Sequence, residues 1–203
     1  MPYRRTPAVQ ARLDAQRGAV LDAAVELLAE RGYAGCTMSA VAERAGLATG
    51  SLYRHFPSKS ALSVELFRTV VSREVAAVSQ AAHRHADLVD AIVAAIETFA
   101  SRALKAPRLA YALLAEPADP AVDAERLVFR RAFRDVFAER IAEGVARGVL
   151  PPQDAALTAA ALVGAGAEAL IGPLSDPQAG PDTVPALVTF TIRALGVTDA
   201  SDT

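Results

Sequence analysis

One stretch of the chain, Thr37 to Lys59, has side chains suited to contact with a nucleic acid. Hydroxyl, aromatic and basic side chains donate hydrogen bonds to phosphate oxygens and to the edges of bases. Within this stretch, Leu52 and Phe56 are four residues apart and therefore share one face of a helix. If that face is turned inward, the other residues of the helix are left to contact a partner: Thr49, Gly50, Ser51, Tyr53, Arg54 and His55.

Two of these residues suggest more specific chemistry. Arg54 can donate two hydrogen bonds to O6 and N7 of a guanine, and a phosphate contact is the alternative. Gly50 has no Cβ, so the helix backbone can approach a DNA backbone closely at this point. The free N–H groups of a helix N-terminus also attract phosphate. Near the N-terminus, Arg4 and Arg5 could reach a minor groove, and a solvated tail is the alternative.

The elements that would position these residues form a small helical head, residues 1–60. Apolar periodicity predicts a helix over Arg17–Arg31 that stops at Gly32, with Thr6-Pro7 as an alternative earlier start. A short helix capped by Thr37 ends at Gly46, and a second one runs over Thr49–Phe56. A longer helix follows from Ser58 to about Val78. Helices of two turns are marginal alone, so the two short ones must pack on their neighbours.

The run from Gly46 to Lys59, Gly-x-x-x-Gly-Ser-Leu-Tyr-x-His-Phe-x-x-Lys, closely resembles the DNA-binding region of the tetracycline-repressor (TetR/AcrR) family. The resemblance extends over residues 17–75 and implies a helix-turn-helix. It implies that Tyr53 and His55 touch phosphates or the groove wall and that Lys59 binds phosphate. Residues near phosphates or base edges would be Thr37, Ser39, Thr49, Gly50 and Ser51. A helical corner that packs against another part of the chain is the alternative.

The sequence departs from the family at Ala48, where a serine or threonine usually precedes the second short helix. Alanine has no side-chain oxygen with which to cap the helix, a loss of about 1 kcal/mol. We therefore expect Ala48→Ser to stabilise the protein, unless Thr49 provides the cap.

Residues 61–203 are expected to form a second helical domain. Helices are predicted over Leu88–Lys105, Pro107–Ala115, Val122–Arg147, Asp154–Ile171 and Val184–Leu195, which gives an all-α fold of about nine helices. The resemblance implies that this domain binds a small apolar effector. Aromatic residues are the candidate ligand-binding residues, with ordinary core as the alternative: Phe99, Tyr111, Phe129, Phe133 and Phe137. Glu116 and Glu168 could supply a polar group, although Glu116 could equally end a helix in solvent.

Small residues indicate where two copies of the chain could meet. Ala156, Ala160 and Gly164 are four apart on one predicted helix, beside Leu157, Leu162 and Val163. Together with Leu187, Phe190 and Ala194, they resemble the dimer interface of the family. A twofold homodimer would place two recognition helices about 34 Å apart, facing successive major grooves of a near-palindromic operator. Packing within one chain is the alternative.

The charge and composition of the chain constrain its class. The net charge of −2 does not favour a nucleic-acid binder, but residues 1–60 hold eight Lys and Arg against five Asp and Glu, while residues 61–203 hold thirteen against eighteen. A basic head on an acidic body suits DNA contact through the head. We expect the uncharged stretch Ala155–Ala167 to be too short and too weakly apolar to span a bilayer. We expect a cytoplasmic, nucleoid-associated protein with no membrane partner.

Enzyme signatures are weak. His83-x-His85-x-Asp87 does not share a helix face, and Gly164-Ala-Gly166 lacks the strand and Gly-Lys-Ser of a phosphate loop. Cys36 precedes a helix N-terminus, which would lower its pKa, but no base is near it in sequence. We expect no catalytic residue, metal or cofactor. A helical protein-interaction module and an all-α enzyme remain alternatives, and the sequence leaves the effector, the operator and the sign of regulation open.

Overall fold

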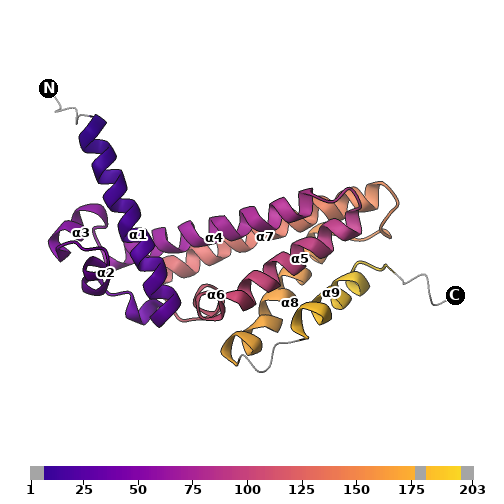
Figure 1. Ribbon diagram of the computed structural model, residues 1–203. Coiled ribbons are helices and arrows are strands. Elements are labelled where there is room, and N and C mark those ends of the chain that lie inside the picture. The colour runs from indigo at the N-terminus through magenta and orange to yellow at the C-terminus, as the bar shows by residue number, and fades with distance from the viewer. Residues whose placement is uncertain (1–6, 177–181, 198–203) are drawn as a thin grey trace.

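The computed structural model describes residues 7–176 and 182–197, and within these ranges the chain forms nine helices and no strand (Figure 1). The predicted all-α fold is confirmed. The helices are α1 Pro7–Gly35, α2 Met38–Arg44, α3 Thr49–His55, α4 Lys59–His83, α5 Leu88–Lys105, α6 Pro107–Leu114, α7 Pro120–Ala146, α8 Ala155–Ser175 and α9 Thr183–Ala194.

Side-chain caps explain why most of these helices begin where they do. Thr37, Ser58, Asp87, Asp119 and Asp154 each stand before the first residue of a helix and accept a hydrogen bond from a backbone N–H of its first turn. Such a side chain satisfies one of the N–H groups that the start of a helix leaves without a partner.

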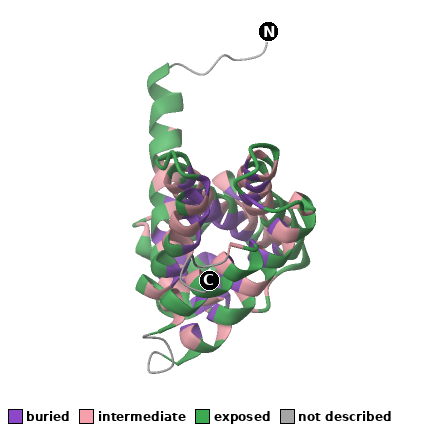
Figure 2. Ribbon diagram, turned by 90° about the vertical axis from the view of Figure 1, so that its right-hand side faces the viewer, coloured by how far each residue is buried: buried purple, intermediate pink, exposed green. Residues whose placement is uncertain are grey.

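Helix α1 takes the earlier of its two predicted starts. It begins at Pro7, ten residues before Arg17, and continues through Gly18, so the expected weakness at Gly18 does not break it. Its first two turns are mostly exposed and extend beyond the rest of the molecule (Figure 2), which explains why they have no apolar periodicity. Gly32 interrupts the helix with a φ of +67°, as its predicted role as a stop requires.

Helices α4 and α8 also run past their predicted ends. Val78 and Ala82 are buried near the end of α4, so its apolar face continues beyond the predicted end at Val78 to His83. Helix α8 passes Glu168 and Pro173 without ending. The stretch expected to be too short to span a bilayer is part of a 21-residue helix, whose most apolar 18-residue window has a mean hydropathy of 1.6. By length and composition alone this helix could cross a membrane, so that expectation was wrong.

Two apolar cores lie along the molecule, and α4 contributes to both. The first lies between α1, α2, α3 and the first half of α4, and it also takes in Ala112 of α6 and Val122 of α7. The second lies between α5, α7, α8, α9 and the end of α4. Helix α4 packs against both α5 and α7 (Figure 1). The proposed division at residue 60 therefore falls at the start of a continuous helix that connects both cores.

Candidate nucleic-acid interface and ligand cavity

Helices α2 and α3 form a helix-turn-helix that is attached to the head by a few apolar side chains. Gly46, in the turn between them, has a φ of +67°, a conformation that residues with a Cβ rarely adopt. Leu52 is fully buried and Phe56 is 2% exposed, which confirms the predicted inward face of α3. Beneath α3, the guanidinium of Arg17 lies 4.8 Å from the centre of the Phe56 ring and is paired with Glu65.

The opposite face of α3 is polar and open to solvent. Thr49, Gly50, Tyr53 and Arg54 are exposed, and Ser51 and His55 are half-buried. The guanidinium of Arg54 donates a hydrogen bond of 2.9 Å to the Ser51 hydroxyl. The three remaining candidate residues, which lie outside α3, are exposed as well: Thr37, Ser39 and Lys59.

Two cations at or beside this face, Arg54 and Lys59, differ from Arg44 in having no carboxylate partner among the described residues. Arg44 donates to both carboxylate oxygens of Glu30, at 2.9 and 2.8 Å, and also pairs with Glu26, so its charge is neutralised within the head. In contrast, no carboxylate of residues 7–176 or 182–197 pairs with Arg54 or Lys59. Their charge is available to a polyanion. The predicted minor-groove residues Arg4 and Arg5 lie outside the described residues.

Helix α3 lacks a side-chain cap, and this leads to a testable prediction. Ala48 is the N-cap of α3, with φ −68° and ψ 140°, and no side chain caps the helix. A serine there could accept from the first turn, so Ala48→Ser should raise the free energy of unfolding by about 1 kcal/mol and the Tm by roughly 2–4 °C. Thermal denaturation followed by circular dichroism measures this. Ala48→Val has no oxygen and should give no gain; equal shifts in both variants would contradict the capping argument.

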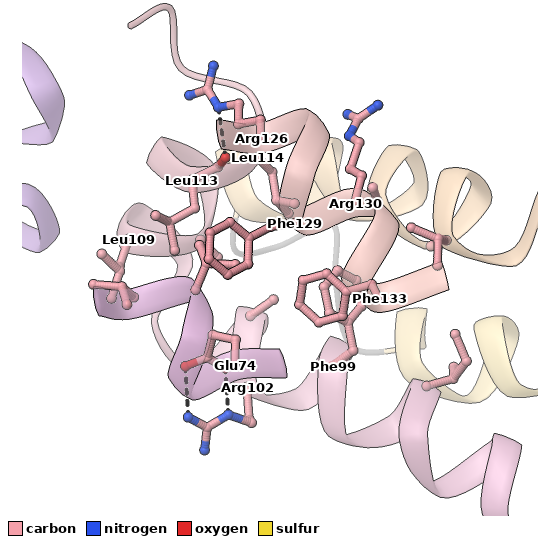
Figure 3. Close-up of a pocket in the computed structure, with 18 of the residues that line it drawn as sticks. Glu74, Phe99, Arg102, Leu109, Leu113, Leu114, Arg126, Phe129, Arg130 and Phe133 are labelled. Carbon is pink, nitrogen blue, oxygen red and sulfur yellow. Dashed lines mark hydrogen bonds and ion pairs between the residues drawn. The ribbon is translucent and has the colours of Figure 1, made fainter. Parts of the chain in front are cut away.

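A cavity of about 120 Å³ lies between α4, α5, α6, α7 and α8 (Figure 3). Four of the five candidate aromatic residues line it: Phe99, Phe129, Phe133 and Phe137. The rings of Phe99 and Phe133 meet edge to face with centroids 5.5 Å apart. Tyr111 is not among the lining residues; it is half-buried and packs against the second core. The structure also places Arg102, Arg126, Arg130 and Glu74 on the cavity wall, which the sequence did not indicate.

Glu116 connects the cavity to the head and does not end a helix in free solvent. Its carboxylate accepts a hydrogen bond of 2.9 Å from the backbone N–H of Tyr33 in α1. It lies so close to Gly32 that a Cβ there would be 2.5 Å from both carboxylate oxygens. Arg126, on the cavity wall, donates to the backbone carbonyl of Glu116 at 2.6 Å and to that of Ala112 at 2.9 Å. Two hydrogen-bonded steps therefore lead from the cavity wall to the head.

The residues considered as possible catalytic or metal-binding groups lie in ordinary structural positions. Cys36 is buried and its thiol donates to the Ala24 carbonyl at 3.6 Å. Burial raises the pKa of Cys36 to about 11, which is the opposite of the lowering expected at a helix N-terminus. His83 lies in the last turn of α4, where its Nδ1 is 2.7 Å from the Ser79 carbonyl. Glu168 is exposed on α8 and does not line the cavity.

An apolar face of α8 and α9 is open to solvent. Only 28% of the most apolar window of α8 is buried. Leu157 of α8 is 68% exposed and Phe190 of α9 is 45% exposed, and Gly164 and Ala194 are exposed beside them. The predicted dimer face also named Leu162 and Leu187; both are buried in the second core of the same chain, so that part of the prediction was wrong.

Comparison with known proteins finds sequence matches mainly in the head. Residues 20–66 match the model of the family described as "Bacterial regulatory proteins, tetR family". The chain is 37% identical over 86 residues to the HTH-type transcriptional activator FasR of Mycolicibacterium smegmatis, covering 42% of this chain and 39% of FasR. It is 40% identical over 60 residues to the HTH-type transcriptional repressor KstR2 of Mycobacterium tuberculosis, covering 30% of each. The matched region is thus well under half of each relative.

Solved structures resemble nearly the whole chain in fold. The transcriptional regulator FadR from Bacillus subtilis, solved with stearoyl-CoA, superposes with a TM-score of 0.76 at 20% identity, over 89% of this chain and 98% of that one. The SmeT–triclosan complex gives a TM-score of 0.74 at 21% identity, over 89% and 91%. At this level of identity the likeness shows the fold alone.

Proposed function

We propose, on the premise that the N-terminal part of this chain belongs to the tetR family of bacterial regulatory proteins, that the protein is a DNA-binding transcriptional regulator. The observation that supports this most directly is the outer face of α3. Its inner side is closed by Leu52 and Phe56, while its polar side is exposed and includes Arg54, which has no carboxylate partner among the described residues. A surface of this kind suits the major groove.

Individual roles follow from the chemistry of the side chains. Arg54 would read a guanine, and its bond to Ser51 would keep the guanidinium near the start of α3. Tyr53 and His55 would touch phosphates or the groove wall. Lys59, at the first turn of α4, would bind a phosphate, and Thr37, Ser39, Thr49 and Gly50 would lie near phosphates or base edges.

The cavity would make the binding conditional. A small, mainly apolar effector would occupy the space among the phenylalanines. FadR and SmeT are described in complex with stearoyl-CoA and triclosan, two ligands with large apolar bodies. An effector shifts the equilibrium only if it binds better to a conformer whose heads no longer fit DNA. Repression relieved by the effector is the proposed mode, although the relatives include both an activator and repressors.

Two chains would act together at the operator, in the cytoplasm. The exposed apolar face of α8 and α9 is the proposed contact of a twofold homodimer, since an exposed helix of this hydropathy needs a cover. Soluble dimers would hide this face from water, and a membrane is not needed to explain it. Twofold symmetry predicts a near-palindromic operator.

Selection of random-sequence DNA with the purified protein tests this proposal. We expect enrichment of a near-palindrome whose half-sites are about one helical turn apart. Binding to that site should weaken steeply with salt, and Lys59→Ala, which removes one phosphate contact from each chain, should reduce the log–log salt slope by about two per dimer. Arg54→Ala should relax the base preference at one position in each half-site. A helical protein-interaction module would yield no enriched sequence, and that outcome would overturn the proposal.

A further inference from the structure

The charges on the cavity wall do not cancel. Glu74 and Arg102 neutralise each other, because the guanidinium donates to both carboxylate oxygens at 2.6 and 2.8 Å. Arg126 pairs with Asp123 at 2.6 Å and donates to three backbone carbonyls. Arg130 lines the cavity, is exposed, and has no ion pair or hydrogen bond within the described residues. The wall therefore retains a positive charge that no protein group offsets.

The rest of the wall is purely apolar. Apart from these four charged residues, the described lining consists of Phe, Leu, Ile, Val, Ala and Gly, with no hydroxyl, amide or imidazole. A ligand with several neutral polar groups would bury them without side-chain partners, which is unfavourable. A hydrocarbon body has no polar group to bury, so it can occupy the same place without this cost. The wall thus favours a ligand whose polar chemistry is confined to one end.

The position of the charge indicates where that end would lie. In Figure 3, Arg126 and Arg130 extend from α7 on one side of Phe129 and Phe133, and the Glu74–Arg102 pair lies on the other side. The guanidinium of Arg130 is turned away from the rings, and the residue is exposed, so we take it to mark the open edge of the cavity. A charged group at this edge would stay partly hydrated while its apolar body enters between the phenylalanines.

We propose that the cavity binds an amphipathic anion: an apolar body among the phenylalanines and a carboxylate or phosphate on Arg130. A guanidinium can donate two parallel hydrogen bonds to either group. Apolar cavities of about 150 Å³ bind benzene, so a cavity of about 120 Å³ accommodates a body of about five or six carbon atoms without displacing side chains. The binding chemistry is read from the wall alone; its role as the signal that releases DNA rests on the proposed function.

Calorimetric titration of the full chain without DNA tests the ligand class. Three probes share a six-carbon body and differ in the head: hexanoate, hexyl phosphate and hexanol. We expect the wild-type protein to bind at least one anion on the order of tenfold more tightly than hexanol. The better anion distinguishes a fatty-acid-like ligand from a phosphate-bearing one. Arg130→Gln should remove the preference, and Arg130→Lys should keep most of it.

Arg131→Gln is the matched control. Arg131 is the next residue of α7, is also exposed, and does not line the cavity; its Nε donates to the Leu127 carbonyl at 3.4 Å. This variant should keep the wild-type preference. Equal affinity for hexanol and both anions, no binding of any probe, or equal effects of the two glutamine variants would overturn the proposal. Because these titrations contain no DNA, they are independent of the DNA selection, and either proposal can fail alone.

Discussion

Leu157→Glu is expected to leave the chain monomeric and to weaken its binding to the selected operator by on the order of 10²–10⁴-fold. Leu157 is 68% exposed in α8, on the apolar face that we assign to the dimer contact. In a dimer this face would be buried, and a glutamate there would lose its hydration without a partner. Two linked heads engage neighbouring half-sites with a high effective concentration, and a monomer loses that gain.

Light scattering and DNA-binding anisotropy measure the two effects. The fold should survive, because substitutions of exposed residues usually change stability by less than about 0.5 kcal/mol. Leu127→Glu is the matched control: Leu127 is 60% exposed, but it lies on α7, outside the α8–α9 face. This control should remain dimeric and bind the operator normally. A dimeric Leu157→Glu protein, or a monomer with unchanged operator affinity, would refute the proposed contact.

The parts of the fold that depend on local sequence were predictable. Leu52 and Phe56 share a helix face because of their spacing alone, and the structure buries both. Thr37 and Ser58 cap helices because their hydroxyls act on residues three further along. Such features need only a few consecutive residues, so the sequence contains all the information that determines them.

Helix ends and buried faces were predicted less well, because both depend on distant parts of the chain. The first turns of α1 are helical without an apolar face, and α8 continues through Glu168 and Pro173 while packed against α5, α6, α7 and α9. Periodicity marks a residue as inward-facing without naming its neighbour. Leu162 and Leu187 were therefore placed at a dimer contact, whereas they pack within their own chain.

Contacts between residues far apart in sequence could not be predicted at all. Glu116 binds the backbone of Tyr33, 83 residues away, and nothing in the local sequence of either residue indicates the other. Gly32 gave a partial signal: its predicted role as a helix stop implied a positive φ, and the structure shows that the lack of a Cβ also makes room for the Glu116 carboxylate. The lack of a Cβ at Gly32 thus permits both the positive φ and the close approach of the Glu116 carboxylate.

Glu116→Ala is expected to uncouple the cavity from the head. The substitution removes the acceptor of the Tyr33 N–H and breaks the path from Arg126 through Glu116 to α1. An effector that weakens operator binding at least tenfold in the wild-type protein should change it less than about twofold in the variant, since coupling requires an element that both sites bias. Glu116→Gln keeps an oxygen acceptor and should keep most of the response. The measurement is operator affinity with and without the effector.

A double-mutant cycle with Gly32→Ala separates this contact from general destabilisation. Gly32→Ala places a Cβ at a φ of +67°, which costs about 1–2 kcal/mol, and also crowds the Glu116 carboxylate. Glu116→Ala leaves the Tyr33 N–H without its partner, at a cost of about 1–3 kcal/mol. Because Glu116→Ala also removes the crowding, the double variant should lose less stability than the sum of the single losses, by about 1 kcal/mol or more. Strict additivity in urea denaturation, or a normal effector response in Glu116→Ala, would show that the signal reaches the head by another route.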